Sequence, residues 1–110
     1  MRVTGWHVLL KESVVDDLRA LGPQPGRALL KEATRRLAAD PLAETRQMKT
    51  RRPNSVAQRE LRLLGKHRVL FNIDRLQRRV TIVLVGEKRG EALIVQGRRF
   101  RAHHESDPAE

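Results

Sequence analysis

The sequence predicts an α+β domain in which an N-terminal strand and a helical hairpin precede an antiparallel β-meander, with the helices packed on one face of the sheet. Three observations predict this class. Apolar residues alternate near the N-terminus, recur at helical spacing in the segment that follows, and form short runs between turn residues in the second half. A chain of 110 residues suits one domain, which we place at 1–101, before a polar, flexible tail at 102–110.

The first half of the chain predicts one strand and two helices. Residues 3–10 alternate as expected of a strand that is covered mainly on one face. Ser13 can cap a first helix, which Gly22-Pro23 ends. Pro25-Gly26 precedes a second helix, and Asp40-Pro41 stops it. The apolar side chains at helical spacing are Val14, Leu18 and Leu21 in the first helix and Leu30, Ala33 and Leu37 in the second.

The next part predicts a loop and two strands. Residues 42–55 lack periodicity and are rich in bases, so we expect an exposed basic loop. Residues 58–64 are expected to form a strand, and a tight turn at Gly65-Lys66 leads into the next one. On the first strand, alternation separates Arg59, Leu61 and Leu63 from Glu60, Arg62 and Leu64; on the second, it separates Val69, Phe71 and Ile73 from Arg68, Leu70 and Asn72.

The last part predicts the middle and the end of the sheet. Residues 80–85 are apolar almost throughout, as a central strand covered on both faces would be. A polar turn at 74–79 is expected before this strand, and a charged, flexible connection at 86–90 after it. Residues 92–95 can add a short final strand, and the chain turns polar beyond Gly97.

Positive charge dominates the composition. Lys and Arg number 23 against 13 acids, a net charge of +10, which favours polyanions such as nucleic acid, an anionic membrane or an acidic protein. A need for solubility alone is the simpler explanation of this net charge. The chain has no cysteine, which excludes disulfides and thiolate metal sites. Because no apolar run approaches the roughly 18 residues of a membrane span, and no signal-peptide core is present, we expect a cytoplasmic protein without a membrane partner.

Three segments resemble one protein family. They are QMK (47–49), RELRLLGKHRVLFNID (59–74) and VTIVLVGEKRG (80–90), and their order and spacing together are similar to the RelE/ParE superfamily of bacterial toxins. The resemblance runs from about Trp6 to Val95. It implies the toxin of a type II toxin–antitoxin module, neutralised by a bound antitoxin. RelE-like members cut messenger RNA on the ribosome, whereas ParE-like members inhibit DNA gyrase without being nucleases.

The resemblance also implies where a basic site for RNA cleavage would lie. Such cleavage needs a deprotonated 2′-hydroxyl, a stabilised phosphorane and a protonated leaving oxygen, and arginine suits the phosphorane because its planar fork donates two hydrogen bonds. By position, the basic catalytic groups of the family correspond to Arg68 above all, with Arg59, Arg62 and either Lys88 or Arg89, of which we place Arg89 in the catalytic set. The bases expected to hold substrate are Lys49, Arg51, Arg52, Lys66 and Lys88. Surface bases without a role are the alternative.

The general base is left open by the sequence. Many RelE-like nucleases have a Tyr or a His near the C-terminal end of the sheet, and this chain has no Tyr. The remaining candidates are His67, His103, His104, Glu60 and Glu87, and we place His103 in the site because histidine titrates near neutral pH. We expect no cofactor and no metal, because adjacent residues such as His103 and His104 point apart.

Two other functions stay open. The missing Tyr favours a ParE-like gyrase inhibitor, and the net charge would also fit a catalytically degenerate basic binding module. We expect a hetero-complex with an antitoxin and, for a nuclease, messenger RNA and the ribosome as further partners. A sheet face that carries Leu61, Leu63 and Leu70 among arginines could accept an acidic, amphipathic segment of the antitoxin.

Overall fold

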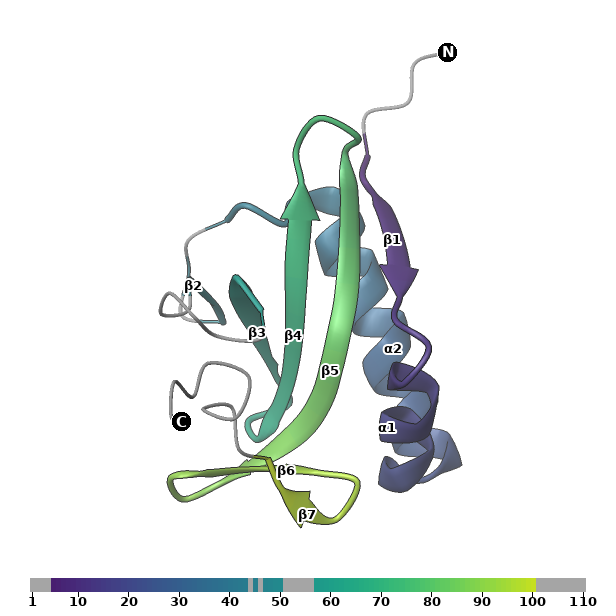
Figure 1. Ribbon diagram of the computed structural model, residues 1–110, viewed down its shortest axis with the longest axis vertical. Helices are drawn as coiled ribbons and strands as arrows, with labels where there is room; N and C mark the ends of the chain where they lie inside the picture. The colour runs from purple at the N-terminus through teal and green to yellow at the C-terminus, as the bar shows by residue number, and fades with distance from the viewer. Residues whose placement is uncertain (1–4, 44, 46, 51–56, 101–110) are drawn as a thin grey trace, which may run out of the picture.

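The computed structural model describes residues 5–43, 45, 47–50 and 57–100, and it confirms the predicted α+β architecture. The predicted tail at 102–110 lies outside these residues. In Figure 1, α2 passes behind β5 and β1, and α1 lies beside the lower part of β5. No helix in the described part of the chain is long and apolar enough to cross a membrane. The elements are β1 (His7–Leu10), α1 (Val14–Leu21), α2 (Pro23–Ala39), β2 (Met48–Thr50), β3 (Arg59–Leu63), β4 (His67–Asp74), β5 (Arg79–Arg89), β6 (Ala92–Val95) and β7 (Arg98–Arg99).

The sheet is built around β5. Across the sheet the order is β2-β3-β4-β5-β6-β7, each strand antiparallel to its neighbour, and β1 pairs with β5 in parallel. β1 pairs with residues 79–82 of β5 and β6 pairs with residues 87–89 (Figure 1). β4 pairs with β5 along its opposite side. The prediction of a central strand is therefore confirmed.

The strands differ from the prediction in three places. The predicted flexible connection at 86–90 is wrong, because β5 continues through Arg89 and pairs with β6, and the turn lies at Gly90 and Glu91. The predicted loop at 42–55 contains β2, whose Met48 is buried opposite Leu61 of β3. β7 is absent from the prediction, since a strand of two exposed arginines has no apolar pattern.

The two helices form the predicted hairpin with shifted details. α2 begins at Pro23 and so includes Pro25-Gly26 instead of following them; proline suits this first turn because its missing N–H would have no partner there. The buried residues of α2 include Leu29 in place of the predicted Leu30. Ser13 stands at the N-cap of α1 without a capping side-chain hydrogen bond, since its own backbone is already helical (φ −65°, ψ −17°).

Two cores lie on opposite faces of the sheet, and the predicted alternation of β3 and β4 is confirmed. The larger core lies between helices and sheet and contains Val14, Leu29, Ala33, Leu37, Met48, Leu61, Leu63, Val69, Phe71, Val80, Ile82 and Val85. The smaller core consists of Ala57, Leu70 and Leu84, against which Val83, Leu93, Val95 and Phe100 pack. The second face is thus partly covered by the chain's own β6 and the residues after it.

Gly26 lies at the closest approach of the two helices. A Cβ added there would stand 2.7 Å from the carbonyl oxygen of Leu18 in α1. Because side-chain atoms do not pack this close to backbone oxygens, the hairpin keeps its geometry only with glycine at this position.

We expect Gly26→Ala to lower the free energy of unfolding by about 1–2 kcal/mol, because the added methyl group forces the helices apart although alanine is the better helix former. Chemical denaturation measures the difference. Gln24→Ala is an exposed change in the same helix and should stay within about 0.5 kcal/mol of the wild type. A Gly26→Ala protein as stable as the wild type would contradict the close packing.

Candidate functional site

Arg62 and Arg68 face each other across neighbouring strands on the sheet face away from the helices. Arg62 of β3 is the register partner of Arg68 of β4. The Nη1 of Arg68 donates to the carbonyl oxygens of Gly65 (3.0 Å) and His67 (3.1 Å), and its side chain is 14% exposed. The turn that joins the two strands therefore holds this guanidinium in place while leaving one side of it accessible.

Glu60 stands beside these two arginines. Its Oε2 lies 2.7 Å from the Nε of Arg62 and 4.0 Å from the Nε of Arg68. Strand alternation puts Glu60 and Arg62 on one face of β3. Lys49 of β2 is the register partner of Glu60, so it belongs to the same face.

Arg68 lines a cavity of about 220 Å³, which we call the basic pocket. Five strands (β3 to β7) and the turn after β5 contribute to it. Gly86, the partner of Arg68 on β5, allows this arrangement, since a Cβ there would stand 2.5 Å from the carbonyl oxygen of Ile94 and block the approach of β6. The lining residues are Glu60, Arg68, Lys88, Glu91, Ala92, Leu93, Arg99 and Phe100.

The electrostatics of the basic pocket favour an anion. Burial lowers the pKa of the Arg68 guanidinium, the positive charge of Arg62 lowers it further, and Glu60 opposes both effects. An arginine nevertheless keeps its proton at neutral pH. A bound anion would offset both the burial of the Arg68 guanidinium and its repulsion from Arg62. The anion would take the place of the lost water and would balance the neighbouring positive charge.

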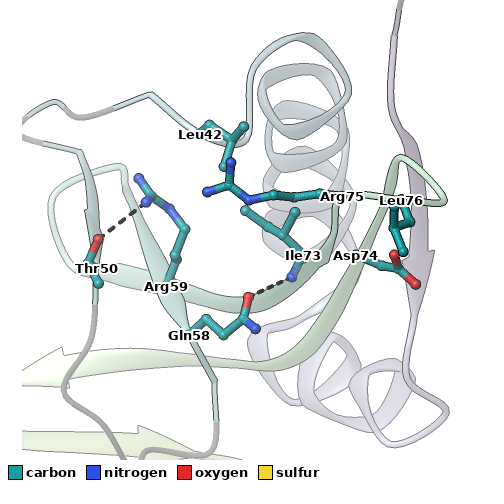
Figure 2. Close-up of a pocket in the computed structure, with 8 residues that line it drawn as sticks. All are labelled: Leu42, Thr50, Gln58, Arg59, Ile73, Asp74, Arg75 and Leu76. Atoms are coloured by element: carbon teal, nitrogen blue, oxygen red, sulfur yellow. Dashed lines mark hydrogen bonds between the residues drawn. The ribbon is translucent and has the colours of Figure 1, made fainter.

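Arg59 lies on the other face of the sheet, away from the basic pocket. It is buried (8% exposed), and its guanidinium donates to the carbonyl oxygen of Ala43 (2.6 Å) and the Oγ1 of Thr50 (3.2 Å). Figure 2 shows Arg59 directed toward Thr50 in a larger, open pocket of about 840 Å³. The lining residues of this pocket are Leu42, Thr50, Gln58, Arg59, Ile73, Asp74, Arg75 and Leu76. These contacts fasten β3 to β2 and to the segment before it.

Strand alternation also separates Arg89 from Lys88. Lys88 lines the basic pocket, whereas Arg89 donates to Glu87 Oε1 (3.2 Å), on the same strand. Lys66 approaches the same carboxylate, with its Nζ 3.7 Å from Glu87 Oε2. Of these three predicted site residues, the structure brings only Lys88 to Arg68.

His67 is buried on the helix-facing side of β4, where it cannot reach the basic pocket. Its register partners are Leu63 and Glu87, and its Nε2 lies 3.8 Å from Glu87 Oε2. Its Nδ1 is buried without a hydrogen-bond partner among the described residues. Burial lowers the pKa of this imidazole, Glu87 opposes the shift, and Lys66 and Arg68 add to it.

Several predicted site residues lie outside the described part of the chain, namely Arg51, Arg52, His103 and His104. Conversely, the structure adds Arg99 and Phe100, which the sequence did not single out. In the sequence, the GRRF segment after Gln96 could have indicated these two residues. A turn at this segment becomes recognisable only from the pairing of β6 with β7. No group of three His, Asp or Glu side chains that could hold a metal ion occurs within the described ranges.

The fold and this arrangement can be compared with known proteins. No protein-family model matches the chain, and no curated protein matches it. Among solved structures, it is similar to a chain of the toxin–antitoxin complex RelBE2 from Mycobacterium tuberculosis, with a TM-score of 0.63 and 26% identity, covering 79% of this chain and 95% of that chain. The resemblance to the RelE/ParE superfamily is thereby confirmed, and the chain has the fold of a RelE-type toxin.

The buried His67 makes stability depend on pH. Because its folded pKa lies below the ordinary value of 6.5, the unfolded chain takes up the proton first as the pH falls. The contribution of His67 to stability is therefore complete above about pH 6.5 and is lost as the pH falls through its folded pKa. As the pH is lowered from about 8 to about 5, we expect the unfolding free energy of the wild type to fall more steeply than that of the His67→Gln variant.

Urea denaturation at a series of pH values measures this slope. Gln24→Ala, an exposed change that removes no titratable group, should keep the wild-type slope. Parallel curves for His67→Gln and the wild type would mean that His67 titrates alike in both states.

Proposed function

We propose that this chain is the toxin of a type II toxin–antitoxin module and that it acts as a RelE-like, ribosome-dependent endoribonuclease of messenger RNA. The observation that carries the proposal is the basic pocket, in which Arg68 and Lys88 lie beside an acid, Glu60, on a fold similar to that of a RelBE complex. Net charge alone would fit many partners, but a partly buried guanidinium next to a second one fits a phosphate in particular.

The chemistry assigned to the pocket uses groups that are all present on the described face. The 2′-oxygen attacks the phosphorus and the bond to the 5′-oxygen breaks, which leaves a 2′,3′-cyclic phosphate and a 5′-hydroxyl. Arg68, with Arg62 beside it, stabilises the phosphorane. Glu60 accepts the proton of the 2′-hydroxyl, and Lys88 supplies the proton for the departing oxygen. Phe100 offers an aromatic surface on which a base can stack.

The other predicted cations have supporting positions in this proposal. Lys49 lies on the same sheet face and can hold the RNA backbone beyond the scissile phosphate. We assign a structural role to Arg59, Arg89 and Lys66. Each of them contacts protein oxygens away from the basic pocket and so stabilises the fold without touching RNA.

Arg68→Ala should abolish growth arrest on induced expression and lower the rate of message cleavage on ribosomes by about 10²-fold or more, because the phosphorane loses its main cation. The reaction is followed by primer extension on messages bound to ribosomes. Arg75→Ala, which removes an exposed arginine from the larger pocket, is the matched control and should remain toxic.

A fully toxic Arg68→Ala protein would contradict the assignment of the pocket. Intact messages together with inhibited DNA supercoiling would contradict the nuclease and support the gyrase-directed alternative. Absence of any growth effect from the wild-type chain would support a degenerate binding module.

The proposed antitoxin partner needs an exposed apolar surface, and the surface expected from the sequence does not provide one. Leu61 and Leu63 are buried under the helices, and Leu70 is buried under β6 and Phe100. The predicted docking face on these leucines is therefore wrong, because both sides of the sheet at this level are already covered by the chain itself.

The helical hairpin carries a better surface, an apolar groove of about 320 Å³ that opens to solvent. Arg19 and Arg27 flank it, and Val15 and Leu10 at its margin are 41% and 38% exposed. The lining residues of the groove are Leu10, Val15, Leu18, Arg19, Gly22, Pro23, Gly26, Arg27 and Leu30. An acidic, amphipathic helix would place its apolar side chains in the groove and its carboxylates beside the two arginines, and we assign this surface to the antitoxin.

We expect a neighbouring gene to encode an acidic antitoxin. Val15→Glu should weaken binding of that antitoxin by about tenfold or more, because it puts a carboxylate into the groove facing an acidic partner. Toxicity without the antitoxin should remain, since Val15 does not line the basic pocket. Leu76→Glu, at a leucine that is 97% exposed on the β4–β5 turn, is the control. Titration calorimetry measures both affinities, and equal weakening by the two variants would contradict the assignment.

A further inference from the structure

Asp17 is a buried acid whose contacts reach from α1 to the far end of the sheet. It is 3% exposed and occupies the sheet-facing side of α1. Its Oδ2 accepts the backbone N–H of Val85 (2.9 Å), and its Oδ1 accepts the side-chain amide of Gln96 (2.6 Å). No other carboxylate in the described part of the chain is as deeply buried.

The contact with Val85 closes a gap in the edge of β5. β1 pairs with β5 only as far as Ile82, and β6 pairs with it only from Glu87 onward. The N–H of Val85 lies between these two stretches, and a buried N–H without a partner is costly. Asp17 supplies the acceptor that neither strand provides.

The contact with Gln96 holds the tip of the β6–β7 hairpin. Gln96 and Gly97 form the turn, with φ values of 54° and 77°. β7 has two residues, and its pairing with β6 involves only Ile94 with Arg99 and Val95 with Arg98. A hairpin this short has little stability of its own, so an external contact at its tip has a large effect on its position.

This hairpin forms much of the basic pocket. Five of the eight lining residues, Glu91, Ala92, Leu93, Arg99 and Phe100, belong to β6, β7 and the residues that flank them. The N–H of Phe100 donates to the carbonyl oxygen of Leu93 (2.7 Å), which places the aromatic ring beside the pocket as long as the hairpin is closed. The position of the tip therefore determines whether Arg99 and Phe100 stand opposite Arg68.

We propose that Asp17, acting through Gln96, is a positioning residue that keeps the β6–β7 hairpin closed and thereby holds Arg99 and Phe100 in the RNA-binding pocket. The part that concerns RNA rests on the function proposed above. The part that concerns the hairpin rests on the two hydrogen bonds of Asp17 and on the gap in the β5 edge.

Exchanging the carboxylate and the amide between positions 17 and 96 tests the proposal. Gln96→Glu places a second carboxylate against Asp17 and should open the hairpin. Asp17→Asn alone should be nearly neutral, because the new amide oxygen can still accept from Val85 and a rotated Gln96 amide can accept from the new amide nitrogen. In the double variant the amide introduced at position 17 donates to the carboxylate introduced at position 96, so the hairpin should close again. Rescue by Asp17→Asn is an effect that simple damage to the hairpin would not show.

Two measurements are made on the full chain. Hydrogen exchange at the Phe100 amide should become about tenfold faster in Gln96→Glu, while exchange at Phe71 in the large core stays the same. Affinity for ribosomes loaded with a message made uncleavable by 2′-O-methyl groups should fall about tenfold. Both quantities should return to within about twofold of the wild type in the double variant. Arg98→Gln changes the net charge of the hairpin by the same amount without touching Asp17, and it should leave the Phe100 exchange rate unchanged.

The outcomes separate the two proposals. If the wild type does not bind the loaded ribosomes, the RNA function fails, and exchange at Phe100 still decides whether Asp17 positions the hairpin. Wild-type exchange in Gln96→Glu, equal acceleration at Phe71, or failure of Asp17→Asn to rescue would each overturn the positioning role.

Discussion

The outer edge of β5 must find hydrogen-bond partners along its length, because backbone groups buried in a sheet cannot be left unpaired. No single strand covers this edge. β1 pairs with its first part, the carboxylate of Asp17 accepts from Val85, and β6 pairs with its last part. The N-terminal strand, the first helix and the C-terminal hairpin are therefore all attached to one strand, and the geometry of both functional surfaces follows from that attachment (Figure 1).

The same strands present different chemistry on their two faces. The helices cover one face with an aliphatic core, and this face also contains the arginine and the histidine that contact protein groups, Arg59 and His67. The opposite face is only partly covered by β6, and it retains Arg62, Arg68 and Lys88 around the basic pocket. Strand parity thus places Arg59 and His67 on the helix-facing side and Arg62, Arg68 and Lys88 on the opposite side, although these residues are close together in the sequence or on paired strands.

The two surfaces assigned to partners lie on different elements. The basic pocket belongs to the sheet and the β6–β7 hairpin, whereas the apolar groove belongs to the helical hairpin and the end of β1. Asp17 is on the helix that forms part of the groove, and through Gln96 it contacts the hairpin that forms part of the pocket. An antitoxin on the groove would therefore bind next to the element that sets the shape of the pocket without needing to fill the pocket itself.

The sequence by itself determined the class of the fold, the strand parity around Arg62 and Arg68, and the central position of the strand after Arg79, because these depend on apolar periodicity that is local along the chain. Other features depend on contacts between distant segments. Only the tertiary structure decided that residues 87–89 pair with β6, that Arg59 turns inward to Ala43, that Lys88 rather than Arg89 meets Arg68, and that Asp17 reaches Gln96. The orientations of Arg59, Lys88 and Arg89 depend on strand register, because a one-residue shift would turn each side chain to the other face of the sheet. Register is set by packing that spans the whole domain, as is the contact between Asp17 and Gln96.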